Sequence, residues 1–128
     1  MNLSNRYNIS MPKIKAISPK EIFLTDVDRI TYLYKRDGKG DIVEVTNVSY
    51  DIKIEEEWIT IVRYDSSHGI LHCHRRVSLI NLQDTPTTLG VIKKGKHENW
   101  LTWAIDDIKS RYANYKRGFL RRSKGRGN

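Results

Sequence analysis

Three of the chain's four histidines fall within one fourteen-residue segment, residues 63–76, together with one aspartate and three arginines. Imidazole exchanges protons near neutral pH, and the planar guanidinium of arginine suits phosphate oxygens. Metal-independent RNA cleavage needs such groups: a base for the 2′-hydroxyl, an acid for the leaving oxygen and cations for the phosphate. The segment therefore supplies candidate catalytic residues Asp65, His68, His72 and His74, and candidate phosphate-binding residues Arg63, Arg75 and Arg76.

Alternating apolar residues on both sides of a Ser-Ser-His-Gly turn predict that this segment is a β-hairpin. A four-residue loop places Arg63 opposite His72, whereas a two-residue loop places Asp65 opposite His72 and Arg63 opposite His74. Both loops are even, so either register gives the same two faces. One face carries Arg63, Asp65, His72, His74 and Arg76. The other carries Trp58, Val62, Tyr64, Leu71, Cys73 and Val77, with Thr60 and Arg75 breaking its apolar pattern.

Two other interpretations of the same residues compete with catalysis. His68, His72 and His74 with Asp65 are numerous enough to ligate a transition metal, but their spacing matches no strong metal signature and the arginines would oppose a dication. We therefore expect no metal and no cofactor. Alternatively, the histidines and Asp65 satisfy one another on a solvated sheet face, and Asp65 starts an Asx-type turn.

The rest of the chain predicts an α+β fold, an antiparallel sheet of four or five strands packed against one C-terminal amphipathic helix. The Ser-Pro-Lys-Glu sequence at 18–21 has the spacing of a capping box and predicts one helical turn. Residues 30–35 and 42–45 flank turn residues and predict a second hairpin. A change of parity indicates a bulge near Thr46 and Asn47 before the strand continues to Ile54.

Apolar residues recur at three- and four-residue steps from Leu101 to Phe119 and predict the closing helix, with its end near Gly118. His97 is expected to be a cap or a surface residue at the start of this helix, and Trp100 and Trp103 are expected to be core or partner-facing anchors. The predicted organisation is a loose N-terminal arm (1–20), an α+β domain (21–117) and a basic C-terminal tail (118–128).

The net charge of +8 comes entirely from the C-terminal region. Residues 109–128 contain eight basic residues and no acidic one, which leaves 15 basic and 15 acidic residues in the remainder. Such a segment attracts phosphate backbones through counterion release. The residues expected to bind nucleic acid are Lys116, Arg117, Arg121, Arg122, Lys124 and Arg126.

Composition also limits where the protein acts. No apolar run approaches the ~20 residues of a membrane-spanning helix, and the first fifteen residues do not resemble a signal peptide. The single cysteine, Cys73, cannot form an internal disulfide and fits a core position. We therefore expect a cytoplasmic protein without membrane contact.

Residues Val62-Arg-Tyr-Asp-Ser-Ser-His-Gly69 followed by His72-x-His74 resemble the Tyr-Asp-x-x-His-Gly signature of the TumE-like toxin families and related small prokaryotic domains. The resemblance covers roughly residues 30–117. It implies a toxin of a toxin–antitoxin pair that acts on RNA and is held inactive by a small antitoxin protein. The N-terminal arm and the basic tail depart from the pattern.

These observations lead to one functional hypothesis and one alternative. The first is a toxin-like endoribonuclease that cleaves RNA without a metal. The alternative is a non-catalytic RNA- or DNA-binding subunit of a nucleoprotein complex. Self-association as a homodimer is compatible with both.

Overall fold

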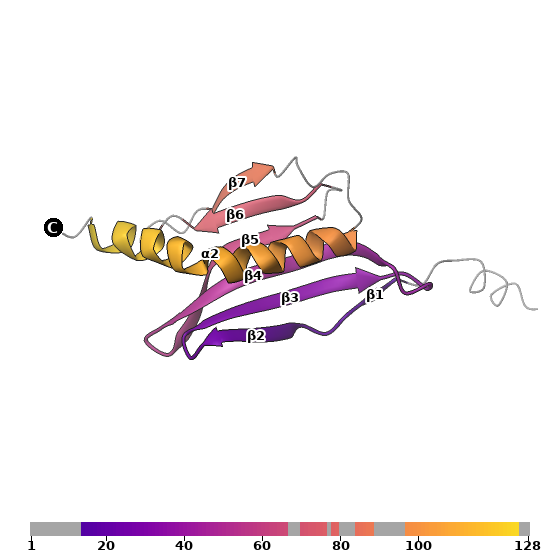
Figure 1. Cartoon of the computed structure of the whole chain (residues 1–128), viewed down its shortest axis with the longest axis horizontal. Helices are drawn as coiled ribbons and strands as arrows, with labels where there is room; N and C mark the ends of the chain where they lie inside the picture. Colours follow the sequence, from indigo (N-terminus) through magenta and orange to yellow (C-terminus); the bar gives the residue numbers. More distant parts are fainter. Residues whose placement is uncertain (1–13, 67–69, 77, 80–83, 89–96, 126–128) are drawn as a thin grey trace, which may run out of the picture.

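The computed structural model describes residues 14–66, 70–76, 78–79, 84–88 and 97–125. Within these ranges the chain forms seven strands and one long helix (Figure 1). The strands are β1 (Lys15–Ala16), β2 (Lys20–Thr25), β3 (Asp28–Arg36), β4 (Ile42–Ile54), β5 (Glu57–Asp65), β6 (His72–Arg76) and β7 (Asp84–Thr88), and the helix is α2 (His97–Gly125).

All strand pairs are antiparallel, and the sheet has the order β1-β3-β4-β5-β6-β7, with β2 also paired to β3. Helix α2 lies across one face of this sheet (Figure 1). The α+β fold predicted from the sequence is confirmed. The sheet has more strands than the four or five predicted. Two strands are hard to recognise in the sequence, because β1 is only two residues long and β7 contains Pro86, which suits a strand at a sheet edge.

The predicted helical turn at residues 18–21 is wrong, because strand β2 begins at Lys20. Ile22 and Leu24 alternate with exposed residues and pack against the core, and the strand pairs with β3 along Lys20–Phe23. The apolar stretch from Ile22 to Leu24 is too short to bury one face of a helix, whereas Ile22 and Leu24, two residues apart, lie on one face of a strand.

The second predicted hairpin and its bulge are confirmed in β3 and β4. Leu33 pairs with Asn47 and Tyr34 pairs with Val45, so Thr46 is the extra residue in β4. The chain then turns into β5 through Glu55 and Glu56, whose φ angles of 49° and 70° are left-handed. Two-residue hairpin loops with left-handed residues match the twist of the strands that they join.

A bulge in β5 was not predicted and changes the position of Trp58. Tyr50 pairs with Val62 but Asp51 pairs with Thr60, so Ile61 is the additional residue. Trp58 therefore lies on the face opposite to Val62 and Tyr64, where the Arg29 guanidinium stacks on its ring at 4.3 Å. The prediction that Trp58 faces the core is wrong, because one inserted residue reverses the alternation.

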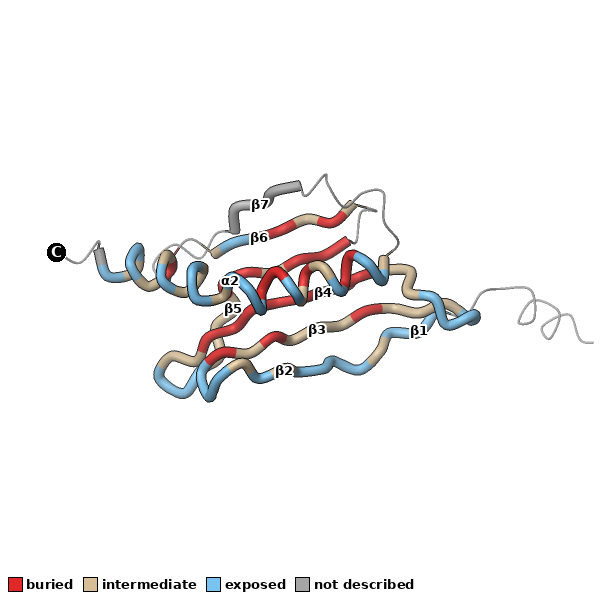
Figure 2. Tube along the Cα trace, in the orientation of Figure 1, coloured by how far each residue is buried: buried red, intermediate tan, exposed pale blue. Residues whose placement is uncertain are grey.

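The hydrophobic core lies between α2 and the strands beneath it, and both carry buried positions (Figure 2). Leu101, Ala104 and Ile108 form its helical side, as the periodicity predicted, and Trp100 and Cys73 are also buried. The helix does not end near Gly118 but continues to Gly125, because Phe119 is buried in the core with only 1% of its surface exposed.

No helix among the described residues is long and apolar enough to cross a membrane.

Candidate functional site

The hairpin formed by β5 and β6 brings the predicted site residues together. Asp65 pairs with His72 and Arg63 pairs with His74, which is the register predicted for a two-residue loop. Cross-strand partners lie on the same face, so these four side chains share the sheet face that α2 does not cover, here called the open face. At its end, β5 is fixed to β4 by hydrogen bonds between the backbones of Ser66 and Val45 and from the Val45 N–H to the Ser66 hydroxyl.

The Asp65 carboxylate connects a histidine and an arginine. Its Oδ2 lies 3.2 Å from His74 Nε2 and 3.3 Å from Arg63 Nη1. The rings of His72 and His74 are tilted against each other with centroids 6.3 Å apart. The His74 side chain is 18% exposed and that of Asp65 12%, so the pair is largely shielded while remaining open to solvent at its rim.

This geometry suits proton transfer beside an anion. A carboxylate in contact with one imidazole nitrogen fixes the orientation of the ring. The second imidazole lies near enough to act on the other side of one phosphodiester. Arg63 provides a guanidinium at the same place, and guanidinium pairs well with phosphate oxygens.

The other predicted site residues are placed differently. Arg75 projects from the face covered by α2, where its guanidinium lies over the Tyr115 ring at 4.9 Å. Arg76 lines a pocket beside α2. His68 and Arg126 lie outside the described residues. Among those described, no three His, Cys, Asp or Glu side chains gather as metal ligands.

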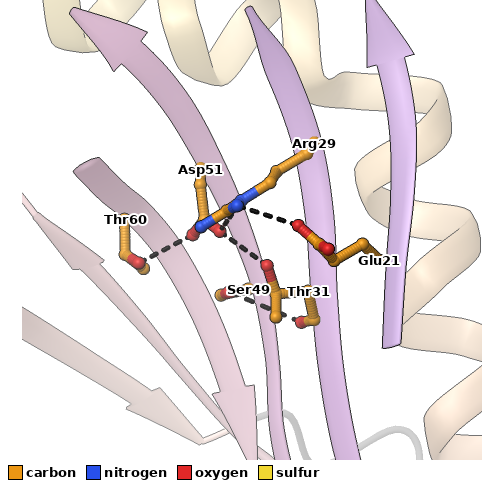
Figure 3. Close-up of polar contacts among 6 residues, drawn as sticks. All are labelled: Glu21, Arg29, Thr31, Ser49, Asp51 and Thr60. Carbon is orange, nitrogen blue, oxygen red and sulfur yellow. Dashed lines mark hydrogen bonds and ion pairs between the residues drawn. The ribbon is translucent and has the colours of Figure 1, made fainter. Parts of the chain in front are cut away.

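Next to this cluster, the open face carries a polar network that the sequence did not predict (Figure 3). The Asp51 carboxylate is only 4% exposed and accepts hydrogen bonds from Arg29 Nε at 2.9 Å and from the hydroxyls of Thr31 and Thr60 at 2.7 Å each. Arg29 also pairs with Glu21 at 2.9 Å. The signal in the sequence was a carboxylate between Tyr50 and Ile52, in the middle of a strand.

The network makes the open face rigid where it borders the site. Ser49 of β4 pairs with Thr31 of β3 and with Arg63 of β5, and Arg63 pairs with His74 of β6. One line of cross-strand neighbours therefore runs from Thr31, which belongs to the network, to the site. A fully satisfied buried carboxylate fixes the positions of its partners. Strands β3, β4 and β5 are therefore held in one register beside the site.

Tyr64, the tyrosine of the Tyr-Asp motif, points away from the open face and joins the sheet to α2. Its hydroxyl donates to the Asp107 carboxylate, which also accepts from the Tyr115 hydroxyl at 2.6 Å and pairs with Arg111 Nε at 3.3 Å. Burial, followed by the hydrogen bond to Asp107, raises the pKa of Tyr64 above its ordinary value. This tyrosine therefore has a structural role.

A second buried carboxylate, Asp28, joins α2 to the sheet near the other end of the strands. The Tyr50 hydroxyl donates to it at 2.5 Å, and Lys116 Nζ lies 3.1 Å away. Burial raises the pKa of Asp28, but hydrogen bonds from Thr25, Tyr50 and Lys116 outweigh burial and lower it below the ordinary value. Lys116, predicted to bind nucleic acid, is thus engaged within the fold.

The other residues of α2 that were predicted to bind nucleic acid form an exposed basic surface. Arg117, Arg121, Arg122 and Lys124 are exposed in the last three turns of the helix. This basic surface lies on the helix, whereas His72 and His74 lie on the open face, so the two features that could contact nucleic acid are on different sides of the sheet.

The chain belongs to a family described as a domain of unknown function, DUF7718, whose model matches residues 18–125. No curated protein and no solved structure matches the chain.

Proposed function

We propose that this protein is an endoribonuclease that cleaves RNA without a metal ion and that His72 and His74 transfer the protons. The observation that carries the proposal is the contact of one carboxylate, Asp65, with both His74 and Arg63, beside His72 on the open face. A pair of imidazoles, one of them in contact with a carboxylate that also contacts a guanidinium, is a set of groups suited to breaking a phosphodiester.

The proposed cleavage reaction has two proton transfers. One imidazole accepts the proton of the RNA 2′-hydroxyl as its oxygen attacks the adjacent phosphorus atom. The other imidazole, in its protonated form, gives a proton to the 5′-oxygen as the bond from phosphorus to that oxygen breaks. Arg63 lies where it can balance the charge that gathers on the phosphate oxygens.

The toxin class comes from the resemblance of residues 62–74 to TumE-like toxins. In this proposal a small antitoxin protein binds the chain and suppresses cleavage. The predicted biological readout is growth arrest when the protein is expressed alone in bacteria.

The test uses the double variant His72→Ala/His74→Ala, with His97→Ala as the matched control, because His97 lies at the start of α2 away from the open face. In buffer with EDTA, wild-type protein and the control should cleave single-stranded RNA. The double variant should be at least roughly 10²-fold slower, since each proton-transfer group contributes roughly 10²- to 10⁴-fold. Binding to RNA should change less than twofold, and growth arrest should disappear with cleavage. Equal cleavage by the double variant would contradict the proposal.

A second function, non-catalytic binding of nucleic acid as a subunit of a larger complex, is supported by one separate observation. The exposed basic surface of α2 does not depend on the histidine cluster. Wild-type protein that binds RNA tightly but neither cleaves it nor slows growth would favour this alternative.

A further inference from the structure

One edge of the sheet carries most of the exposed apolar side chains among the described residues. Strands β1 and β2 lie along this edge, because both pair with the side of β3 that β4 does not occupy. Of the four large apolar residues that are exposed, Ile14 precedes β1, Phe23 lies in β2 and Val27 follows β2, whereas Leu79 lies elsewhere. Ile14 and Phe23 are each 60% exposed. Exposed apolar residues gathered in this way are typical of a surface that binds another protein chain.

Strand β2 presents itself to solvent as an edge strand. Four of its six residues are exposed: Lys20, Glu21, Phe23 and Thr25 (Figure 2). In the described part of the chain it pairs only with β3. The outer N–H and C=O groups of such a strand can form hydrogen bonds with a further strand. The opposite edge strand, β7, contains Pro86, which has no N–H to donate. Of the two edges, the one at β2 is therefore better suited to pairing.

The two faces of β2 both carry apolar side chains at its centre. Ile22 and Leu24 are partly buried and pack against the core on the helix side. Phe23 points to the open face, where its ring centroid lies 6.0 Å from that of Trp58. A strand added at this edge would extend both faces. It would be matched best by a strand that is also apolar on both faces.

A second copy of β2 is such a strand. When two copies pair antiparallel about Phe23, the two Phe23 side chains lie opposite each other on the open face. Ile22 of each copy then lies opposite Leu24 of the other on the helix side. The register also brings Lys20 of each copy beside Asp26 of the other, and both residues are exposed. Apolar residues therefore meet apolar residues at the centre, and opposite charges meet at the ends.

The neighbouring register is less favourable. Centring the pair on Ile22 would place Glu21 of each copy opposite Phe23 of the other, and Lys20 opposite Leu24. Each of these contacts sets a charged side chain against an apolar one. The sequence of β2 thus favours one register of self-pairing.

We propose that this protein forms a homodimer in which the β2 strands of two copies pair antiparallel about a two-fold axis at Phe23. The two sheets continue into one another across this contact. Because the axis is perpendicular to the joined sheet, both α2 helices lie on one side of it and both open faces lie on the other. This inference does not require that the protein cleaves RNA.

The experiment measures self-association of the full chain by analytical ultracentrifugation over a range of concentrations. Phe23→Glu places two like charges opposite each other at the axis. Leu79→Glu is the matched control, because it also replaces an exposed apolar side chain with a charge but lies outside β1 and β2. Lys20→Glu, Asp26→Lys and the variant with both changes test the contact between charges. Thermal unfolding of each variant checks that the fold is retained.

Wild-type protein should show an equilibrium between monomer and dimer. Phe23→Glu should raise the dissociation constant at least tenfold and Leu79→Glu less than twofold. Lys20→Glu and Asp26→Lys should each raise it severalfold, whereas the variant with both changes should recover wild-type association, since opposite charges then meet again. A monomer at every concentration, equal losses in Phe23→Glu and Leu79→Glu, or no recovery in the combined variant would overturn the inference.

Cross-linking tests the register without adding a charge. In Phe23→Cys the two new thiols lie on cross-strand neighbours, whose β-carbons are about 4.5–5.5 Å apart, so mild oxidation should join the chains. Glu21→Cys is the control, because the same register offsets its two copies by four residues, roughly 13 Å. The native Cys73 is buried, and wild-type protein should stay unlinked. Equal linking of both variants, or of neither, would rule out pairing about Phe23.

Discussion

The role assigned to Asp65 depends on a single carboxylate oxygen that contacts both His74 and Arg63. In the proposed reaction this carboxylate does not exchange protons with RNA. It orients the imidazole, so it acts as a positioning residue. Its removal should therefore affect the chemical step more than the affinity for RNA.

The change Asp65→Asn tests this role because it keeps the shape of the side chain and removes its charge. Single-turnover cleavage should slow at least tenfold, while the dissociation constant for RNA should change less than threefold. The same change at an exposed aspartate of α2, Asp106→Asn, serves as the matched control. A loss of binding as large as the loss of rate would show that Asp65 mainly holds the RNA-binding surface together.

At the scale of elements, two buried carboxylates attach α2 to the sheet. Asp107 on the helix is bound by Tyr64 of β5, and Asp28 of β3 is bound by Lys116 of the helix. Such contacts fix where the helix lies, whereas the apolar core provides most of the driving force for packing. Truncation from residue 116 onward would remove Lys116 and the buried Phe119, and would therefore destabilise the fold.

The Tyr64→Phe variant should lose about 1–2 kcal/mol of stability at pH 7, because it removes a buried hydrogen bond to a charged group. The pKa of Tyr64 is raised in the folded protein. Its contribution is therefore fully present below the ordinary tyrosine pKa of about 10 and is lost as the pH rises above it. Urea unfolding at pH 7 and at pH 10.5 should show a smaller alkaline loss for Tyr64→Phe than for wild type. An equal alkaline loss in both proteins would contradict this assignment.

The sequence predicts which face of a strand a residue lies on only where the alternation of residues is not interrupted by a bulge. Alternation in β5 and β6 correctly placed Arg63, Asp65, His72 and His74 on one face, because no irregularity lies between them. Trp58 was misplaced because the bulge at Ile61 leaves no mark in residue types. The network around Asp51 could not be predicted either, since it joins β2, β3, β4 and β5. The order of these strands in the sheet cannot be derived from local sequence patterns.

At the scale of the whole molecule, the candidate catalytic residues and the exposed basic residues lie on different sides of the sheet. The open face carries the histidine cluster and the neutralised Arg29–Asp51 network, whereas the exposed basic residues lie on the last turns of α2. An RNA strand that uses both features would have to pass around an edge of the sheet. The basic surface should therefore contribute affinity without sequence preference, and the cleavage step should not depend on it.

The triple variant Arg117→Gln/Arg121→Gln/Lys124→Gln tests this separation. These side chains are exposed and do not pack in the core. Each phosphate contact contributes about 0.7 to the salt dependence of single-strand binding, so the slope of log K against log salt should fall by about 2. Cleavage at saturating RNA should be unchanged. An unaltered slope would mean that nucleic acid docks elsewhere on the molecule.

The central claim is that an imidazole takes a proton from the RNA 2′-hydroxyl without help from a metal. The most direct measurement compares the wild-type protein, in buffer with EDTA, on an RNA oligonucleotide and on the same oligonucleotide with 2′-deoxyribose at every position. Cleavage of the RNA, with no detectable cleavage of the deoxy strand under the same conditions, is the predicted result. Cleavage of both strands, or of neither, would contradict it.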